Sequence, residues 1–137
     1  MNQPASPRDR FEITIKVLPS DIDQLGHVNN IVYLRWVQEA AIEHWRAFAT
    51  AQQQEEIVWV VVRHEIDYKR AARHGDTVIA CTWVGKAGAR DFERFTEILL
   101  AADRKILAQG RTLWCPLDAR SGRPLRLGAD IRDRFSV

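Results

Sequence analysis

Residues 29–50 read NNIVYLRWVQEAAIEHWRAFAT, a run without proline or glycine that decides the fold of this chain. Apolar residues recur every three or four positions, and the charged residues form a narrow stripe between them, which is the pattern of an amphipathic helix. Asn29 or Asn30 can cap its first turn, because an asparagine side chain accepts a hydrogen bond from the N–H groups at a helix start. The sequence therefore predicts one long helix, and its wide apolar arc predicts burial on most sides.

The segments on either side of this helix have the patterns of β-strands. Residues 11–17, FEITIKV, alternate between apolar and polar, and Pro19 ends the pattern. After the helix, four more strands are predicted, joined by short turns, at residues 57–68, 77–84, 91–100 and 106–117. Short turns require antiparallel neighbours, and one helix covers only one face of a sheet. This order predicts an α+β fold, a curved antiparallel sheet of about five strands around one long central helix, and excludes a doubly wound nucleotide-binding fold.

The length and composition limit the classes of protein that remain. A chain of 137 residues has room for one domain, here residues 11–137 after a loose tail at residues 1–10. The net charge of +2, from 20 basic and 18 acidic residues, predicts neither a nucleic-acid partner nor a membrane surface. The longest apolar run, residues 57–62, is too short to span a bilayer. Two cysteines and a polar N-terminus without signal-peptide character favour a cytoplasmic setting.

Several common catalytic motifs are missing. The sequence contains no Walker loop, no G-x-G-x-x-G, no H-E-x-x-H and no serine within G-x-S-x-G. Cys115 lies in the middle of a predicted strand, so we expect a packed thiol there instead of a nucleophile. His44 and His64 are expected at core or interface positions. No metal ligand set and no cofactor are predicted.

The segment just before the helix is the candidate site. Residues 21–30 read DIDQLGHVNN and combine two carboxylates, a glycine, a histidine and two asparagines. A helix N-terminus stabilises negative charge through its unpaired N–H groups and its dipole. Such a terminus can hold the oxyanion of an acyl-transfer intermediate, with Asp23 as nucleophile or general base. The same residue types are also ordinary cap and loop residues, so the composition alone leaves a purely structural role open.

Two motifs carry a family resemblance. Residues 21–33 follow the pattern D-x-D-x-x-G-H-V-N-N-x-x-Y, which resembles the active-site motif of hotdog-fold thioesterases of the 4-hydroxybenzoyl-CoA thioesterase type. The H-V-N-N element also resembles the plant acyl-ACP thioesterases. Residues 66–76, IDYKRAARHGD, resemble a strand and turn of the same superfamily, and Asp118 with residues 121–124 also fits. The likeness covers residues 10–135 and implies the hotdog architecture, which the strand and helix order predicts independently.

The resemblance implies roles for individual residues. Asp23 takes the position of the catalytic carboxylate, and Asn30 the helix-start position whose backbone N–H binds the thioester carbonyl. His27 matches a histidine of the acyl-ACP branch, as a proton carrier or a residue that shapes the pocket, although Leu25 stands where that branch has asparagine. Cations near the pocket mouth would bind the phosphates of coenzyme A. The residues expected to contact substrate are Gly26, Asn29, Ile31, Tyr33, Lys69, Arg70 and Arg90.

The predicted function is hydrolysis of an acyl or aroyl thioester of coenzyme A, with acyl-ACP as the other carrier. The alternative is a non-catalytic hotdog protein that binds or senses acyl-CoA; a hydratase would need a motif that this sequence lacks. Trp36, Trp45, Trp59 and Trp83 are candidates for shaping an acyl pocket, although core packing is the expected role for most of them. Because residues 57–62 are apolar on both faces, we expect a homodimer or homotetramer whose strands pair edge to edge, with the acyl site at the junction. The resembling family builds its pocket from two subunits.

Overall fold

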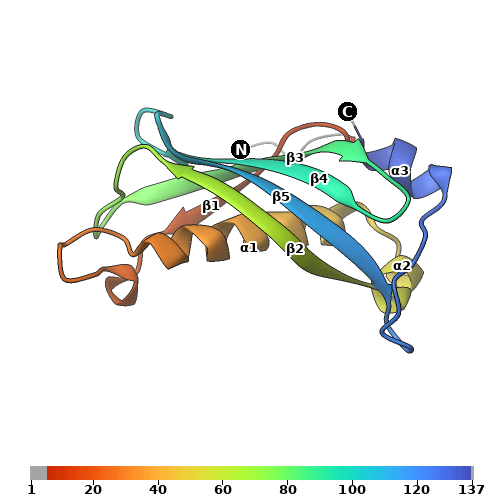
Figure 1. Cartoon of the computed structure of the whole chain (residues 1–137). Coiled ribbons are helices and arrows are strands. Elements are labelled where there is room, and N and C mark those ends of the chain that lie inside the picture. The colour runs from red at the N-terminus through yellow and green to blue at the C-terminus, as the bar shows by residue number, and fades with distance from the viewer. Residues whose placement is uncertain (1–5, 137) are drawn as a thin grey trace.

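The computed structural model describes residues 6–136 of the chain. Its sheet contains five strands, and its longest helix, α1, follows the first of them (Figure 1). The elements are, in chain order, β1 (Phe11–Lys16), α1 (Asn30–Phe48), α2 (Ala51–Glu56), β2 (Ile57–Tyr68), β3 (Thr77–Ala87), β4 (Phe92–Leu100), β5 (Ile106–Asp118) and α3 (Ala129–Phe135), with a short 3-10 turn at Pro19–Asp21.

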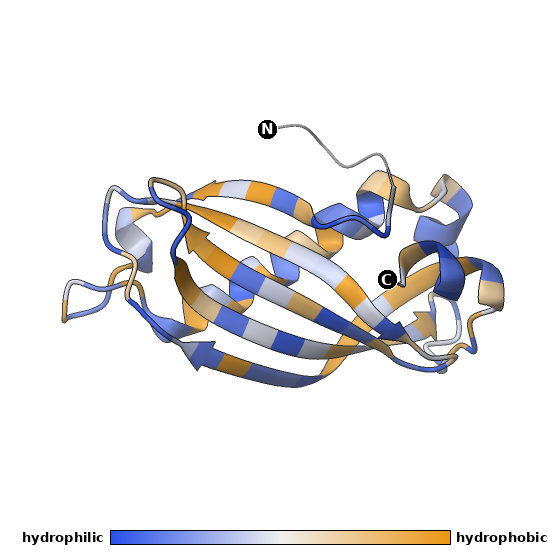
Figure 2. Ribbon diagram, turned by 90° about the horizontal axis from the view of Figure 1, so that it is seen from above, coloured by the Kyte–Doolittle hydropathy of each residue, from blue (hydrophilic) through white to orange (hydrophobic). Residues whose placement is uncertain are grey.

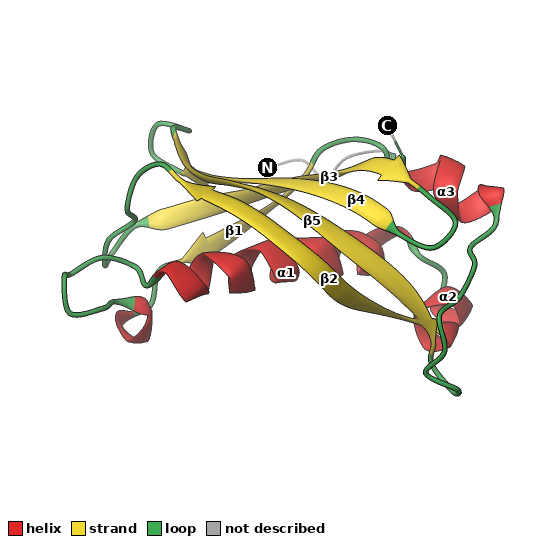
Figure 3. Cartoon of the chain, viewed as in Figure 1, coloured by secondary structure: helices red, strands yellow, loops and turns green. Residues whose placement is uncertain are grey.

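All neighbouring strands of the sheet are antiparallel, and their spatial order is β1-β3-β4-β5-β2. The sheet curves over α1, which lies along its inner face, while α2 and α3 lie at the end of the sheet away from the start of α1 (Figure 3). The predicted α+β fold with about five strands and one central helix is therefore confirmed. Strands β1 and β2 form the two edges.

The ends of α1 follow from local capping. Asn29 is the residue that caps the helix, because its Oδ1 accepts the Ile31 N–H at 3.1 Å. The helix ends at Phe48, two residues before the predicted end, and the short helix α2 begins at Ala51. Thr50 and Gln53 form a capping box for α2, which the sequence analysis did not predict.

The core lies between the inner face of the sheet and the apolar arc of α1. Trp36 and Ala40 on α1 are fully buried and pack with residues of β3, β4 and β5. A second cluster joins the end of α1 to α3, where Trp45 packs against Phe135, and also contains Trp114 and Leu127. Burial of each large apolar side chain stabilises the fold by about 1.5–3 kcal/mol. These contacts hold α1, and hence its N-terminus, in a defined position on the sheet.

Charged pairs cover part of the outer face of the sheet, on which polar and apolar residues are mixed (Figure 2). Arg104 pairs with Glu12 at 2.7 Å, and Arg111 pairs with Glu93 at 2.6 Å. Arg10 pairs with Glu97 and also lies over the ring of Trp83. Trp83 therefore packs on this outer face.

Residues 6–10 differ from the loose tail that we expected at residues 1–10. They form a turn held by Ser6 and Asp9, and the Arg8 Nε donates a hydrogen bond to the carbonyl oxygen of Asp133 at 2.6 Å. The Pro7 carbonyl also reaches the His44 ring. These long-range contacts have no local sequence signal. The remainder of the expected tail, residues 1–5, lies outside the described residues.

His44 and Arg94 form a buried polar pair beneath this turn. The Nη1 of Arg94 lies 2.9 Å from Nδ1 of His44, and because a guanidinium only donates, Nδ1 is the acceptor. The other ring nitrogen, Nε2, therefore carries the hydrogen and donates to the Pro7 carbonyl at 2.9 Å. Burial, with the neighbouring Arg94 charge, lowers the pKa of His44 to about 3. His44 is thus a core histidine, as predicted, and is neutral at pH 7.

This pKa predicts an acid-sensitive fold. Between pH 6.5 and about 3 the unfolded chain binds a proton at His44 that the folded chain excludes, so the free energy of unfolding falls as pH decreases through this window. The loss is up to about 1.4 kcal/mol per pH unit. Urea unfolding at pH 7, 6 and 5 should show a shallower pH dependence for His44→Gln than for the parent. Equal slopes for the two proteins would contradict the assignment.

Candidate active site

The loop before α1 is a tight hairpin that places Asp23 beside His27. The Asn29 N–H donates to the Asp21 carbonyl at 2.8 Å, and the Asp23 N–H donates to the His27 carbonyl at 2.8 Å. Between these two bonds, Ile22 and Val28 form an antiparallel bridge. Gly26 turns the chain with a φ of 78°, a conformation that favours glycine. His27 faces Asp23 across the hairpin and is three residues before Asn30. At most about 11 Å of chain therefore separates His27 from Asn30.

The Asp23 carboxylate is half-buried and uses one of its oxygens to hold this loop. Its Oδ1 accepts the backbone N–H of Leu25 at 2.9 Å and that of His27 at 3.2 Å. These two bonds fix the orientation of the carboxylate and leave Oδ2 without a hydrogen-bond donor among residues 6–136. Asp23 contacts His27 through the backbone of His27.

Asp21, the other carboxylate of the segment, has a different environment. It is buried, with Oδ1 at 2.9 Å from Nη2 of Arg35 and Oδ2 accepting the Leu18 N–H at 2.9 Å. Oδ1 therefore ties the loop to α1, and Oδ2 closes the turn at Pro19–Asp21. Nothing in the sequence indicates this pair, because a 14-residue separation lies outside the helix spacing that marks ion pairs in a sequence.

The first turn of α1 offers one backbone N–H to a ligand. The N–H of Ile31 is taken by the Asn29 side chain, and that of Val32 donates to the Asn29 carbonyl at 2.9 Å. The N–H of Asn30 makes no hydrogen bond to the described part of the chain. First-turn N–H groups have no partner within their own helix, and they carry the positive end of its dipole. Asn30 is thus the donor left for a carbonyl oxygen or an anion.

The two motifs quoted above lie against one another in the structure. The Val28 N–H donates to the Ala72 carbonyl at 2.9 Å, and the Ala72 N–H donates to the hydroxyl oxygen of Tyr33 at 2.8 Å. The Tyr68 hydroxyl donates to the Asn30 carbonyl at 3.1 Å. Burial raises the pKa of both tyrosines, so both hydroxyls are protonated at neutral pH. These bonds hold residues 68–72 beside the start of α1.

A small cavity of about 180 Å³ lies at this junction. Four residues that the sequence analysis named line it together with Tyr68 and Ala71: Asn30, Tyr33, Lys69 and Arg70. Tyr33 is only 1% exposed and its hydroxyl is occupied, so its main structural role is to position the loop. Tyr68 carried no signal of its own, because its place beside Asn30 depends on how β2 packs.

One expected site residue, Arg90, is placed elsewhere. Arg90 lies in the β3–β4 turn, beside α3 and at the opposite end of the sheet from the start of α1 (Figure 1). Within one chain it therefore does not join Lys69 and Arg70. Asp118 accepts the N–H groups of Arg120 and Ser121, and these bonds lower its pKa. Cys115 donates to the Arg90 carbonyl and forms part of β5.

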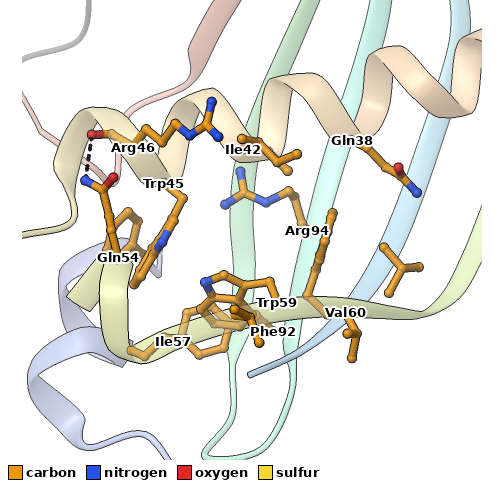
Figure 4. Close-up of a pocket in the computed structure, with 15 residues that line it drawn as sticks. Gln38, Ile42, Trp45, Arg46, Gln54, Ile57, Trp59, Val60, Phe92 and Arg94 are labelled. Carbon is orange, nitrogen blue, oxygen red and sulfur yellow. Dashed lines mark hydrogen bonds between the residues drawn. The ribbon is translucent and has the colours of Figure 1, made fainter. Parts of the chain in front are cut away.

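A larger cavity, of about 690 Å³, lies between the second half of α1 and the first half of β2 (Figure 4). Trp45, Trp59 and Phe92 contribute aromatic walls, and Arg94 reaches in from β4. Trp45 and Trp59, two of the four tryptophans considered for an acyl pocket, thus line a cavity. Trp36 lies in the core instead.

Comparison with known proteins identifies the family. The sequence model of the thioesterase-like superfamily matches residues 17–135, which include both motifs and most of the sheet. The chain belongs to this superfamily. The match agrees with the resemblance found in the sequence.

Several solved thioesterases share the fold of this superfamily member. A Thermus thermophilus thioesterase complexed with coenzyme A and zinc is 27% identical, with a TM-score of 0.78 over 90% of this chain and 94% of that chain. A 1,4-dihydroxy-2-naphthoyl-CoA thioesterase from Synechocystis is 21% identical, with a TM-score of 0.76 over 88% and 90% of the two chains.

A plant enzyme is similar in sequence. The acyl-[acyl-carrier-protein] hydrolase of Cuphea viscosissima is 19% identical over 135 residues, which are 92% of this chain and 32% of that protein. The chain therefore spans about a third of the length of this relative.

No helix among residues 6–136 is long and apolar enough to cross a membrane. The same residues contain no cluster of three or more His, Cys, Asp or Glu side chains that could hold a metal ion.

Proposed function

We propose that this superfamily member hydrolyses an acyl or aroyl thioester to a free acid and a thiol. The observation that supports this most directly is the pairing of an oriented carboxylate, Asp23, with an unpaired N–H at a helix start, Asn30. Attack on a thioester carbonyl moves negative charge onto its oxygen, and a fixed N–H with a helix dipole stabilises that charge. Family membership and the fold of the solved thioesterases support the same reaction.

Asp23 takes part in the reaction in one of two ways. As a nucleophile, Oδ2 adds to the carbonyl carbon, the C–S bond breaks, the thiolate takes up a proton, and water then hydrolyses the mixed anhydride. As a general base, Asp23 removes a proton from a water molecule that attacks the carbonyl carbon, and the proton passes to the leaving sulfur. In both, the Asn30 N–H holds the carbonyl oxygen. His27, next to Asp23 in the hairpin, is the proposed proton carrier to the leaving group.

Coenzyme A is the proposed carrier, with acyl carrier protein as the alternative. Lys69 and Arg70 are exposed and adjoin the cavity at Asn30, where cations would meet the phosphates of the carrier. Gly26, Asn29 and Ile31 shape the loop and the helix start that receive the thioester. Arg90 would reach a bound carrier only through a second subunit, because it lies at the other end of its own chain.

We also propose that the chain works as a homodimer built through β2, with a homotetramer as the larger alternative. Strand β2 is a 12-residue edge, twice the length of the six-residue edge β1. Val58, Val60 and Val62 are 43%, 38% and 58% exposed, so the strand expected to be buried on both sides is open in one chain. A long apolar edge with unpaired backbone groups favours pairing with a second copy. Such pairing would place the two acyl sites at the junction.

The test is release of free thiol from a panel of acyl-CoA, aroyl-CoA and acyl-ACP thioesters, measured beside equilibrium binding of the same compounds. Turnover of at least one class supports hydrolysis and identifies the carrier. Tight binding without thiol release supports the alternative, a non-catalytic protein that binds or senses acyl-CoA. Neither binding nor turnover would contradict both functions.

A further inference from the structure

The 690 Å³ cavity between α1 and β2 has an unusual set of polar groups. Its walls are mostly apolar, and its size is that of pockets that enclose small organic ligands. The lining includes two arginines, Arg46 and Arg94, and two glutamines, but no aspartate or glutamate. Figure 4 shows the guanidinium of Arg94 inside this space, between α1 and the rings of Trp59 and Phe92.

Arg94 is a buried cation without an anionic partner in the described part of the chain. It is 7% exposed, and Nη1 donates to His44 at 2.9 Å and to the Thr82 hydroxyl at 3.1 Å. Both acceptors are neutral at pH 7. Glu93, its neighbour on β4, pairs with Arg111 instead. Burial lowers the pKa of Arg94 to about 10, so the guanidinium stays charged at neutral pH. A buried charge without a counter-charge destabilises a fold unless a ligand supplies one.

Two tryptophans that line the same cavity carry buried indole N–H groups. The Nε1 atoms of Trp59 and Trp114 are buried and have no hydrogen-bond partner, and both side chains line the cavity. An indole N–H can only donate. The group that the cavity offers to a ligand is therefore the Arg94 guanidinium, surrounded by aromatic walls. A ligand that fits has an apolar body and an anionic, hydrogen-bond-accepting group.

We propose that this cavity is a binding site for an apolar carboxylate, with the carboxylate on Arg94 and the apolar body among Trp45, Trp59 and Phe92. The lining of the site begins at Gln38, about 12 Å along α1 from Asn30, and its aromatic part at Trp45 lies about 22 Å away, because a helix rises about 1.5 Å per residue. The free acid released by thioester hydrolysis belongs to this chemical class. The binding site stands whether or not the chain is a hydrolase.

The test is calorimetric titration of the full chain with 4-phenylbutyrate and with 4-phenylbutanamide, which has the same shape without the charge. We expect the acid to bind roughly tenfold or more tightly than the amide, which is the effect of one charge-assisted hydrogen bond. In ¹H–¹⁵N spectra the indole signals of Trp59 and Trp114, assigned with Trp59→Phe and Trp114→Phe, should shift during the acid titration.

Arg94→Met tests the charge itself, since methionine has a similar length and no charge. This variant should bind the acid roughly tenfold more weakly or worse while its affinity for the amide stays unchanged. Arg111→Met is the matched control, because Arg111 is a half-buried arginine on the neighbouring strand whose partners are Glu93 and Glu65. It should bind both compounds as the parent does.

Three results would overturn the proposal. One is equal affinity of the parent for acid and amide, which requires no variant to fold. Another is acid binding that leaves the Trp59 and Trp114 indole signals in place. The third is absence of acid binding into the millimolar range, which would indicate that a side chain of a second subunit pairs with Arg94 or that water hydrates it.

Discussion

Asp23→Asn is expected to lower the rate of thioester hydrolysis by roughly two to four orders of magnitude, the range for loss of a positioned base or nucleophile. Asparagine keeps an oxygen that can accept the N–H groups of Leu25 and His27, the two bonds that hold the loop. It removes the negative charge and the basic Oδ2. The thermal unfolding temperature should therefore stay close to that of the parent while thiol release falls.

The matched control is Asp103→Asn. Asp103 lies in the β4–β5 turn, and its Oδ1 accepts the N–H of Lys105, two residues later, at 2.9 Å. Asp23 accepts the N–H of Leu25 in the same way. This variant should keep the parent rate. Asp21 is unsuitable as a control, because it is buried and paired with Arg35, and its replacement would disturb the loop itself. A folded Asp23→Asn protein that hydrolyses its best thioester at the parent rate would rule out the mechanism.

Two lysines on the β2 edge are expected to convert a dimer into a monomer. Val58 and Val60 lie on this edge, 43% and 38% exposed in one chain, so Val58→Lys/Val60→Lys should leave the fold of the chain intact. Edge-to-edge pairing would bring these charges together, and lysine on an edge strand is a known means of preventing such pairing. In sedimentation velocity, the parent should have twice the chain mass of 15.8 kDa and the variant one chain mass.

Leu18→Lys is the control for this experiment, since Leu18 is another exposed apolar residue, 51% accessible, just before the Pro19–Asp21 turn and away from β2. It should remain a dimer. Thiol release should fall with the dimer in the β2 variant if the acyl sites lie at the junction. A parent protein that is monomeric at micromolar concentration would contradict the proposed assembly, and so would a dimeric β2 variant.

The regular elements were predictable because their signals are local. Periodicity located α1 and all five strands to within a few residues, since burial of one face leaves a repeat of 3.6 or 2 in the sequence. The fold class followed, because short turns allow only antiparallel neighbours. Asn29 and Gly26 could be identified as cap and loop residues from their types alone. The misses among the elements were short: α2 has six residues, and its capping box spans only Thr50 to Gln53.

In the candidate site, too, the residues that are adjacent in the chain could be predicted, and the contacts between distant segments could not. Residues 21–30 stood out in the sequence because a carboxylate, a histidine and a helix start are adjacent in the chain. That Tyr68, Lys69 and Arg70 lie beside Asn30 depends on bonds such as Val28 to Ala72, which join segments more than 40 residues apart. Arg90 was placed with them by residue type, but the β3–β4 turn that carries it lies at the other end of the sheet.

Residue order along the chain thus determined the fold class, the helix that bears the site and the loop that holds Asp23. Only the tertiary structure decided which groups meet: Asp21 with Arg35, Arg94 with His44, and β2 at an open edge. The physical reason is that a hydrophobic repeat and a helix cap act over a few residues, whereas pairing of buried polar groups depends on which distant strands the core brings together. Arg94 in particular has the sequence neighbourhood of an ordinary strand residue, and its burial beside an aromatic cavity arises from packing alone.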